Sequence, residues 1–291
     1  MIASASGRRL DPDEQAALHR PRVAFDEEPV FTSDDAPLLD EARAMLGPTP
    51  RRRRRHGTDE VRTYGHIVVD EAQDLSPLQL RMLSRRSLSG SMTVVGDIAQ
   101  ATGAWAHQDW DEILEQLPAR RPPQRVELSI GYRIPGPNMR LAARVLRVAA
   151  PELRPPRSVR QKGDPPRFVT SQNLLDTVVD TALEERAAVG NGSVAVIGVE
   201  STVTELESRF EARGIEVGHA SRRGLAAPVT LVPVGLAKGL ELDASVVVEP
   251  AEIIEGEAQG ARALYVALTR ATKRLAVVHE RPIPDMMQPD G

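Results

Sequence analysis

Residues 67–74, Ile-Val-Val-Asp-Glu-Ala-Gln-Asp, are the stretch of sequence that decides the fold. An apolar run that ends in acidic residues is typical of a parallel strand buried on both faces. Directly after it, Ser76-Pro77 predicts the start of a helix, because Ser caps the first backbone amides and Pro fits the first turn. Residues 92–95 and 126–130 predict two more strands.

Strands and helices alternate along the rest of the chain. Strands are predicted at 167–170, 193–199, 215–219, 229–232, 245–248 and 275–279, and helices at 137–148, 174–188, 202–213 and 261–271. This alternation predicts an α/β fold in which helices flank parallel sheets. Ligands of such sheets bind beyond the carboxyl ends of the strands, which is where the notable polar residues fall.

Composition is that of an ordinary globular protein, with 41% hydrophobic and 27% charged residues. No apolar run approaches the ~18 to 20 residues that span a bilayer, and Met1–Leu10 lacks the apolar core of a secretory signal. We therefore expect a cytoplasmic protein without a membrane partner. The net charge of −4 gives no overall basic field, and the absence of cysteine excludes disulfides and thiolate metal sites.

Residues 1–60 predict a poorly structured N-terminal segment. Proline recurs in it, acidic clusters alternate with basic ones, and Pro37–Leu46 is the one helix expected there. The run Arg51–Arg55 is expected to be an extended, solvated loop, because five adjacent like charges repel one another. Phosphate binding by this run is the alternative.

The carboxylates that end the first strand suggest phosphate chemistry. An Asp in the position of Asp70 can hold Mg²⁺ through water, because this cation takes oxygen ligands and sits against substrate phosphates. The neighbouring Glu71 can polarise a water that attacks a phosphate. A plain strand end explains the Asp-Glu pair equally well, but the full string of residues 68–74 is far more specific.

The motifs, taken in order, resemble those of the UvrD/Rep group of superfamily 1 helicases, and more closely the HelD-type branch that acts on bacterial RNA polymerase. The resemblance runs from about Gly65 to His279. It implies RecA-like parallel sheets, with residues 61–130 as the back half of the first motor domain and 131–291 as the second. The first domain would then be incomplete.

In the first motor domain, residues 69–74 resemble the Walker B motif, with Asp70 on Mg²⁺ and Glu71 as the catalytic acid. Residues 94–100 resemble the motif whose Gln senses the γ-phosphate, here Gln100. An aromatic residue shortly after that motif stacks on a base of single-stranded nucleic acid in this family, which implies this role for Trp105. Packing of a tryptophan between the domains is the alternative.

Residues 128–133, Leu-Ser-Ile-Gly-Tyr-Arg, resemble the L-x-x-N-Y-R element of the family. The resemblance implies that Tyr132 stacks on adenine and that Arg133 reaches the phosphates. Gly131 stands where the family has Asn, which leaves the geometry of that loop open.

Residues 234–243 resemble the motif that joins the second motor domain to nucleic acid and to the nucleotide sugar. Gly239 and Glu241 would contact the nucleotide, Glu241 at the ribose, and Lys238 the nucleic acid. Residues 264–271 resemble the last family motif, with Arg270 as an arginine finger. Such an arginine contributes ~10³ to 10⁵ in rate.

A phosphate-binding loop of the form G-x-x-x-x-G-K-[ST] is absent from these residues, since none of Lys162, Lys238 and Lys273 follows a glycine. We therefore expect very weak ATP binding and negligible turnover for the chain by itself. The first sheet should also lack the strand that leads into that loop. Residues 23–25 or 30–31 are candidates to fill the gap.

The leading hypothesis is an ATP-dependent DNA helicase or translocase-like motor that uses ATP and Mg²⁺. The resemblance favours DNA over RNA as its polymer, with RNA polymerase and a separate chain that carries the phosphate loop as further partners. A non-catalytic module that binds RNA polymerase or nucleic acid is the alternative. A metal-dependent hydrolase that uses Asp70, Glu71 and Asp74 is a third, weaker hypothesis, because the His partners usual in such sites are missing.

Overall fold

The computed structural model describes residues 7, 9–19, 31–47, 62–103, 105–118, 121–220 and 227–288. Contacts divide the chain into two units, Met1–Asp59 and Glu60–Gly291. The first unit contains helix α2 (Pro12–Ala17) and helix α3 (Asp35–Leu46). Helix α3 confirms the helix predicted near residue 37, whereas α2 was not anticipated.

Two sequence-based expectations fall largely outside the described residues. The arginine run Arg51–Arg55 and residues 23–25 lie outside them, as does Val30. Phe31 is described, and it is 56% exposed and not part of a strand.

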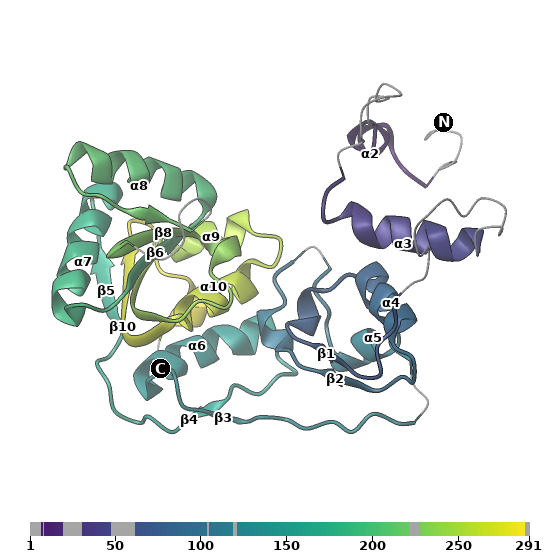
Figure 1. The fold of residues 1–291 in the computed structure, drawn as a ribbon. Helices are drawn as coiled ribbons and strands as arrows, with labels where there is room; N and C mark the ends of the chain where they lie inside the picture. Colours follow the sequence, from purple (N-terminus) through teal and green to yellow (C-terminus); the bar gives the residue numbers. More distant parts are fainter. Residues whose placement is uncertain are drawn as a thin grey trace. The chain divides into compact units, whose positions relative to one another are not determined.

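The second unit is built mainly on one six-stranded sheet with the strand order β5-β10-β9-β6-β8-β7 (Figure 1). Its strands are β5 (Arg167–Thr170), β6 (Val194–Gly198), β7 (Gly218–His219), β8 (Val229–Pro233), β9 (Leu242–Val248) and β10 (Ala271–His279). Every neighbouring pair runs parallel. The predicted α/β fold with parallel strands is confirmed.

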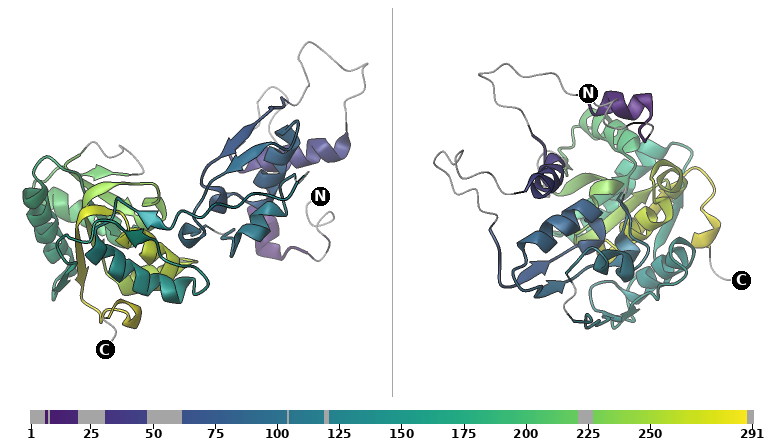
Figure 2. Two further views of the ribbon diagram at one scale, coloured as in Figure 1. Left: turned by 90° about the horizontal axis from the view of Figure 1, so that it is seen from below. Right: turned by 90° about the vertical axis from the view of Figure 1, so that its right-hand side faces the viewer.

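Helices cover both faces of this sheet (Figure 2). They are α6 (Gly136–Ala149), α7 (Leu174–Val189), α8 (Glu200–Ala212), α9 (Pro250–Gly256) and α10 (Gly260–Leu268). Alternate residues of β6 enter two different cores: Ala195 and Ile197 pack with α6, α9 and α10, whereas Val194 and Val196 pack with α7 and α8. The strand is therefore buried on both faces, as a parallel strand between two helical layers must be.

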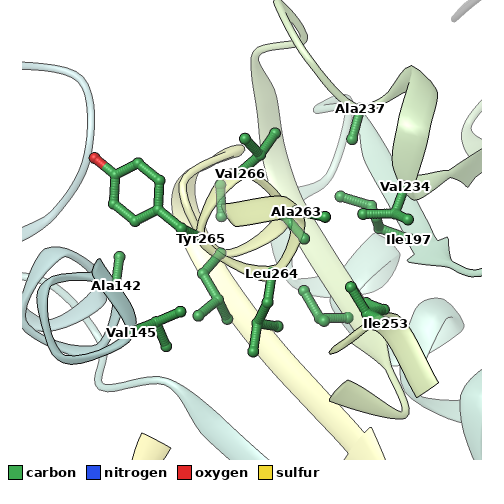
Figure 3. Close-up of a cluster of buried hydrophobic side chains, with 14 of the residues drawn as sticks. Ala142, Val145, Ile197, Val234, Ala237, Ile253, Ala263, Leu264, Tyr265 and Val266 are labelled. Atoms are coloured by element: carbon green, nitrogen blue, oxygen red, sulfur yellow. The ribbon is translucent and has the colours of Figure 1, made fainter. Parts of the chain in front are cut away.

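Helix α10 is buried along nearly its whole length, since every residue except Ala261 is buried. Its apolar residues Ala263, Leu264 and Val266 are at most 3% exposed, and they belong to one buried cluster with Ala142 and Val145 of α6 on one side and Ile197 and Val234 on the other (Figure 3). A helix that is apolar on all sides is stable only when it is buried on all sides. Its place next to the sheet is therefore strongly determined.

A smaller substructure precedes this sheet. Strands β1 (Ile67–Val69) and β2 (Met92–Val94) form a parallel pair, accompanied by helices α4 (Pro77–Arg86) and α5 (Trp110–Leu114). Ser76 and Gln79 form a capping box at the start of α4, as Ser76-Pro77 predicted. We call residues 62–118 module A and residues 136–288 module B.

The strand predicted at 126–130 is mostly absent. Only β3 (Ile130–Gly131) forms, paired with β4 (Arg157–Ser158), and residues 121–128 make no backbone hydrogen bond to any other described residue. Val126 and Leu128 are 75% and 85% exposed. The pattern of the sequence is that of a strand, but none of the described strands lies beside it to satisfy its backbone.

Two further expectations need correction. Val68 of β1 is 68% exposed, because the described helices of module A pack only against the face that carries Val69. The strand predicted at 215–219 is shortened to β7, at the edge of the large sheet. Within the described ranges, no helix has the length and apolar character needed to cross a membrane.

The junction between α9 and α10 generates a test of this packing. A Cβ atom on Gly260 would lie 2.0 Å from the carbonyl oxygen of Ile254. Gly260→Ala should therefore destabilise the protein by ~1 to 3 kcal/mol through overpacking, although alanine is the better helix former. Gly235→Ala is the control, because its Cβ would meet no atom within 4 Å. Equal thermal unfolding temperatures for the two variants would contradict this account.

Candidate functional site

The first part of the site lies at the carboxyl end of β1. The Glu71 N–H donates to Asp70 Oδ1 at 2.9 Å, and Glu71 itself has a left-handed φ of 51°. A non-glycine residue in this region of φ is strained, and such strain persists only where the surroundings fix the backbone. Gln73 Nε2 donates to Glu71 Oε2 at 2.6 Å, so that the carboxylate is held as well.

Gln73 joins the ends of the two strands, a role that the sequence analysis missed. Its side chain is fully buried, and its Oε1 accepts the N–H of Asp97 at 2.9 Å, just after β2. Residue 96 must be glycine, because a Cβ there would lie 2.3 Å from Gln73 Oε1. The glycine in Val95-Gly96-Asp97 was the signal that could have revealed this bridge.

Gln100 is the residue on which the contacts between the modules converge. Its Nε2 donates to Asp97 Oδ2 at 2.8 Å, and its Oε1 accepts a hydrogen bond from Arg270 Nη2 at 3.1 Å. Asp97 also accepts the N–H of Ala99 at 3.0 Å, which fixes the short turn that carries Gln100. The amide of Gln100 is thus oriented from module A and presented to module B.

Arg270 follows helix α10 and is only 8% exposed. Its Nε donates to the carbonyl of Val266 at 2.9 Å, and Nη2 also donates to Thr269 Oγ1 at 3.0 Å. Burial lowers the pKa of Arg270, and the positive charge of Arg133 acts in the same direction. An arginine stays charged even so, which leaves a poorly solvated cation at this point.

The lysine of the motif at 234–243 also reaches module A. Lys238 Nζ lies 2.6 Å from Asp74 Oδ2, 3.0 Å from the carbonyl oxygen of Gln100 and 3.6 Å from Glu71 Oε2. The side chain is 15% exposed. Lys238, for which we expected a contact with nucleic acid, therefore balances the charge of two carboxylates of module A in this structure.

The remaining predicted nucleotide-contact residues form a more exposed group. Arg133 Nη1 forms an ion pair with Glu241 Oε1, and the guanidinium carbon lies 6.0 Å from the centre of the Tyr132 ring. Tyr132 is 71% exposed. Gly239 has a φ of +73°, a conformation that glycine adopts without strain, in the turn that leads to Glu241.

The two tryptophans are in different environments. Trp110 packs against the small core of module A, whereas Trp105 is 63% exposed. Trp105 lies on the segment that follows Gln100. An exposed indole ring can stack on a base, so base stacking by Trp105 stays a prediction.

The chemistry of the donors fits a magnesium ion at Asp70. One of its oxygens accepts the Glu71 N–H, and the other has no hydrogen-bond partner among the described residues. Mg²⁺ is usually held by one or two carboxylates, several waters and the phosphates of the substrate. Within the described ranges, no three His, Asp or Glu side chains are grouped so that they could hold a metal by themselves.

A cavity of about 940 Å³ lies elsewhere on module B and contains none of the predicted site residues. It is lined by six glutamates, namely Glu200, Glu205, Glu252, Glu255, Glu257 and Glu280. This wall would repel a triphosphate, because like charges at short range oppose binding. The size of a cavity is therefore a poor guide to the functional site here.

The contacts of Lys238 generate a test of the link between the modules. Lys238→Met should speed hydrogen exchange of residues 67–100 by up to about fivefold, equivalent to ~1 kcal/mol, because Glu71 and Asp74 lose a partner. Lys273→Met is the control, because Lys273 pairs with Asp243 at 2.7 Å inside module B. The effect should shrink at high salt, which screens exposed charges. Unchanged exchange in the Lys238 variant would show that the contact is energetically irrelevant.

Two comparisons with known proteins gave matches to parts of the chain. Residues 52–117 match the family described as the UvrD/REP helicase N-terminal domain. Among solved structures, the chain is similar to the C-terminal domain of a possible DNA helicase from Lactobacillus plantarum WCFS1, at 25% identity and a TM-score of 0.42, over 54% of this chain and 92% of the other. No curated protein matches. The segment with Asp70, Glu71 and Gln100 is therefore similar to a helicase domain.

Proposed function

We propose that this chain is the C-terminal part of a helicase-type motor in which a nucleotide binds between modules A and B. The observation that carries the proposal is the 3.1 Å contact between Arg270 Nη2 and Gln100 Oε1. Through Gln100, which also binds Asp97, this contact connects the arginine just past α10 to a carboxylate at the strand ends of module A. The match of residues 52–117 to a helicase family supports the same function.

Each of these side chains has a distinct task in the proposed site. Asp70 holds the metal ion, which supplies charge neutralisation to the phosphates when it is bound. Glu71, oriented by Gln73, polarises the attacking water. Arg270 needs no large rearrangement to face the γ-phosphate, because four hydrogen bonds already orient its guanidinium. Preorganised charge of this kind is effective because little reorganisation is left for the reaction.

The ion pair of Arg133 and Glu241 forms the more open side of the proposed site. Tyr132 presents an aromatic face for adenine, Glu241 an acceptor for the ribose, and the turn at Gly239 brings the backbone close. Binding of a nucleotide would exchange the Arg133–Glu241 pair for contacts with phosphate and sugar. Exposed ion pairs are weak, so this exchange costs little.

Single-stranded nucleic acid is the proposed polymer, with DNA favoured over RNA and Trp105 as a stacking platform. The HelD-type character of the motifs extends the proposal to bacterial RNA polymerase and to a cytoplasmic protein. A non-catalytic binding module is the second candidate function. The contact of Lys238 with Glu71 and Asp74 favours it, because a cation from the chain already occupies the carboxylates.

The phosphate-binding loop is proposed to come from outside these 291 residues, on a separate chain or a separate segment. Two features support this. Strand β2 has only β1 as a described partner, and residues 121–128 make no backbone hydrogen bond to other described residues. A parallel strand placed there would end at the same edge as Asp70 and Asp97, where a phosphate loop is needed.

The DNA upstream of the Met1 codon provides one test. The motor proposal predicts a reading frame there that encodes an apolar strand followed by G-x-x-x-x-G-K-[ST]. Adjoining frames without such a loop would favour the non-catalytic module instead.

Assays on the purified 291-residue chain provide a second test. We expect binding of single-stranded DNA that weakens by ~1 to 3 kcal/mol in Trp105→Ala, because one stacking partner is lost. We expect no ATP hydrolysis above that of Glu71→Gln. Hydrolysis that disappears in Glu71→Gln would show that no external loop is needed. Absence of any DNA binding by the parent chain would contradict the proposed polymer.

A further inference from the structure

Arg262, near the start of α10, is a buried cation that has no role in the site described above. Its side chain is 4% exposed, and its hydrogen bonds go to neutral acceptors. Nη1 lies 3.2 Å from the carbonyl oxygen of His107 and 3.5 Å from that of Ala101, and Nη2 lies 3.1 Å from Gln108 Oε1. Its Nε is buried without a partner. Glu112 attracts this charge but forms no hydrogen bond with it, and a buried charge without a hydrogen-bonded carboxylate is costly, so its presence calls for an explanation.

All three acceptors of Arg262 belong to one segment of module A. Residues 101–108 follow Gln100 directly, and Trp105 lies among them. The far end of this segment is tied to module A, since His107 Nε2 lies 2.8 Å from the carbonyl oxygen of Leu75. Arg262 thus binds the backbone carbonyls of Ala101 and His107, near the two ends of this loop.

Helix α10 contacts both ends of the segment that runs from Gln100 to Gln108. Arg262, near its start, binds the carbonyls around Trp105, and Arg270, just past its end, binds the side chain of Gln100. Between these two arginines the helix is encased in the core of module B. Packed helices move as rigid bodies, so a displacement of α10 relative to module A would act on Gln100 and on the tryptophan segment together.

We infer that Arg262 is a positioning residue that fixes the segment 101–108 to α10, so that the placement of Trp105 depends on the helix that holds Arg270 on Gln100. The inference deepens the proposed function, on which its link to nucleic acid rests. The planar fork of arginine suits this task because Nη1 reaches the carbonyls at both ends of the loop while Nη2 reaches the side chain of Gln108. Lysine has a single nitrogen and lacks the second one that reaches Gln108.

The mobility of Trp105 tests the positioning role without any ligand. In a Trp110→Phe background Trp105 is the sole tryptophan, since the chain has two. We expect Arg262→Met to increase acrylamide quenching of Trp105 and to lower its fluorescence anisotropy. Arg144→Met is the matched control, because Arg144 Nη2 donates to the carbonyl of Met287 at 2.9 Å inside module B. Quenching in Arg262→Met equal to that of the parent would overturn the inference.

Two further variants keep this test decisive if Arg262→Met unfolds. Gln108→Ala removes one exposed acceptor of Arg262, and it should increase the quenching of Trp105 while the protein stays folded. Arg262→Lys keeps the charge and loses the second nitrogen, so we expect quenching above that of the parent and close to that of Gln108→Ala. Quenching at the parent level in both variants would overturn the inference.

Binding of a fluorescein-labelled oligo(dT) then tests whether Arg262 acts through Trp105. Arg262→Met and Trp105→Ala should each weaken binding by about fivefold or more, the lower end of what one stacked base contributes. The double variant should bind no more weakly than Trp105→Ala. In that variant the indole ring is already missing, so the loss of Arg262, which positions it, has no further effect on binding. Additive losses would overturn the inference. If the parent fails to bind oligo(dT), the proposed polymer is wrong, and the quenching result alone decides the role of Arg262.

Discussion

The hydrogen bond from the guanidinium of Arg270 to the amide of Gln100 is the contact on which the arrangement of the site depends. Each partner is fixed by its own module: Asp97 orients Gln100, and the backbone of α10 orients Arg270. The adjacent residues Ile98 and Ala99 reinforce this junction, since Ile98 enters the core of module A and Ala99 that of module B. A polar contact between buried groups is strong only when both are held in place, and both are.

Charge compensation explains why so many cations gather here. Glu71, Asp74 and Asp97 lie close together at the carboxyl ends of two short parallel strands, where their mutual repulsion would be costly. Lys238 and Arg270, which come from loops of module B, offset that repulsion. The carboxylates therefore attract module B to module A, and a bound metal ion with its nucleotide would alter that attraction. The charge bound at the strand ends would therefore affect how strongly module B is held to module A.

The two sheets differ in completeness for a simple physical reason. In module B each central strand has a neighbour on both sides and a helical layer on both faces, which satisfies the backbone and buries the side chains. In module A each strand of the pair β1–β2 has only the other as a described partner, so both outer edges are open among the described residues, and Val68 is exposed on the uncovered face. The apolar residues Val126 and Leu128 have a strand-like pattern, but no described strand lies beside them. An exposed apolar edge of this kind is suited to receive another strand.

The sequence by itself determined the α/β class, most strands and helices of module B, the capped start of α4, and the identity of the charged residues at the strand ends. Hydrophobic periodicity and capping are local, so they can be recognised in a short window. Tertiary structure alone decided that residues 121–128 make no backbone hydrogen bond to other described residues and that Lys238 contacts Asp74. It also decided that Gln73 bridges the strand ends and that Arg262 is buried against the Trp105 segment. These contacts join residues far apart in the chain. Their existence depends on which surfaces the cores bring together, a property that no local pattern encodes.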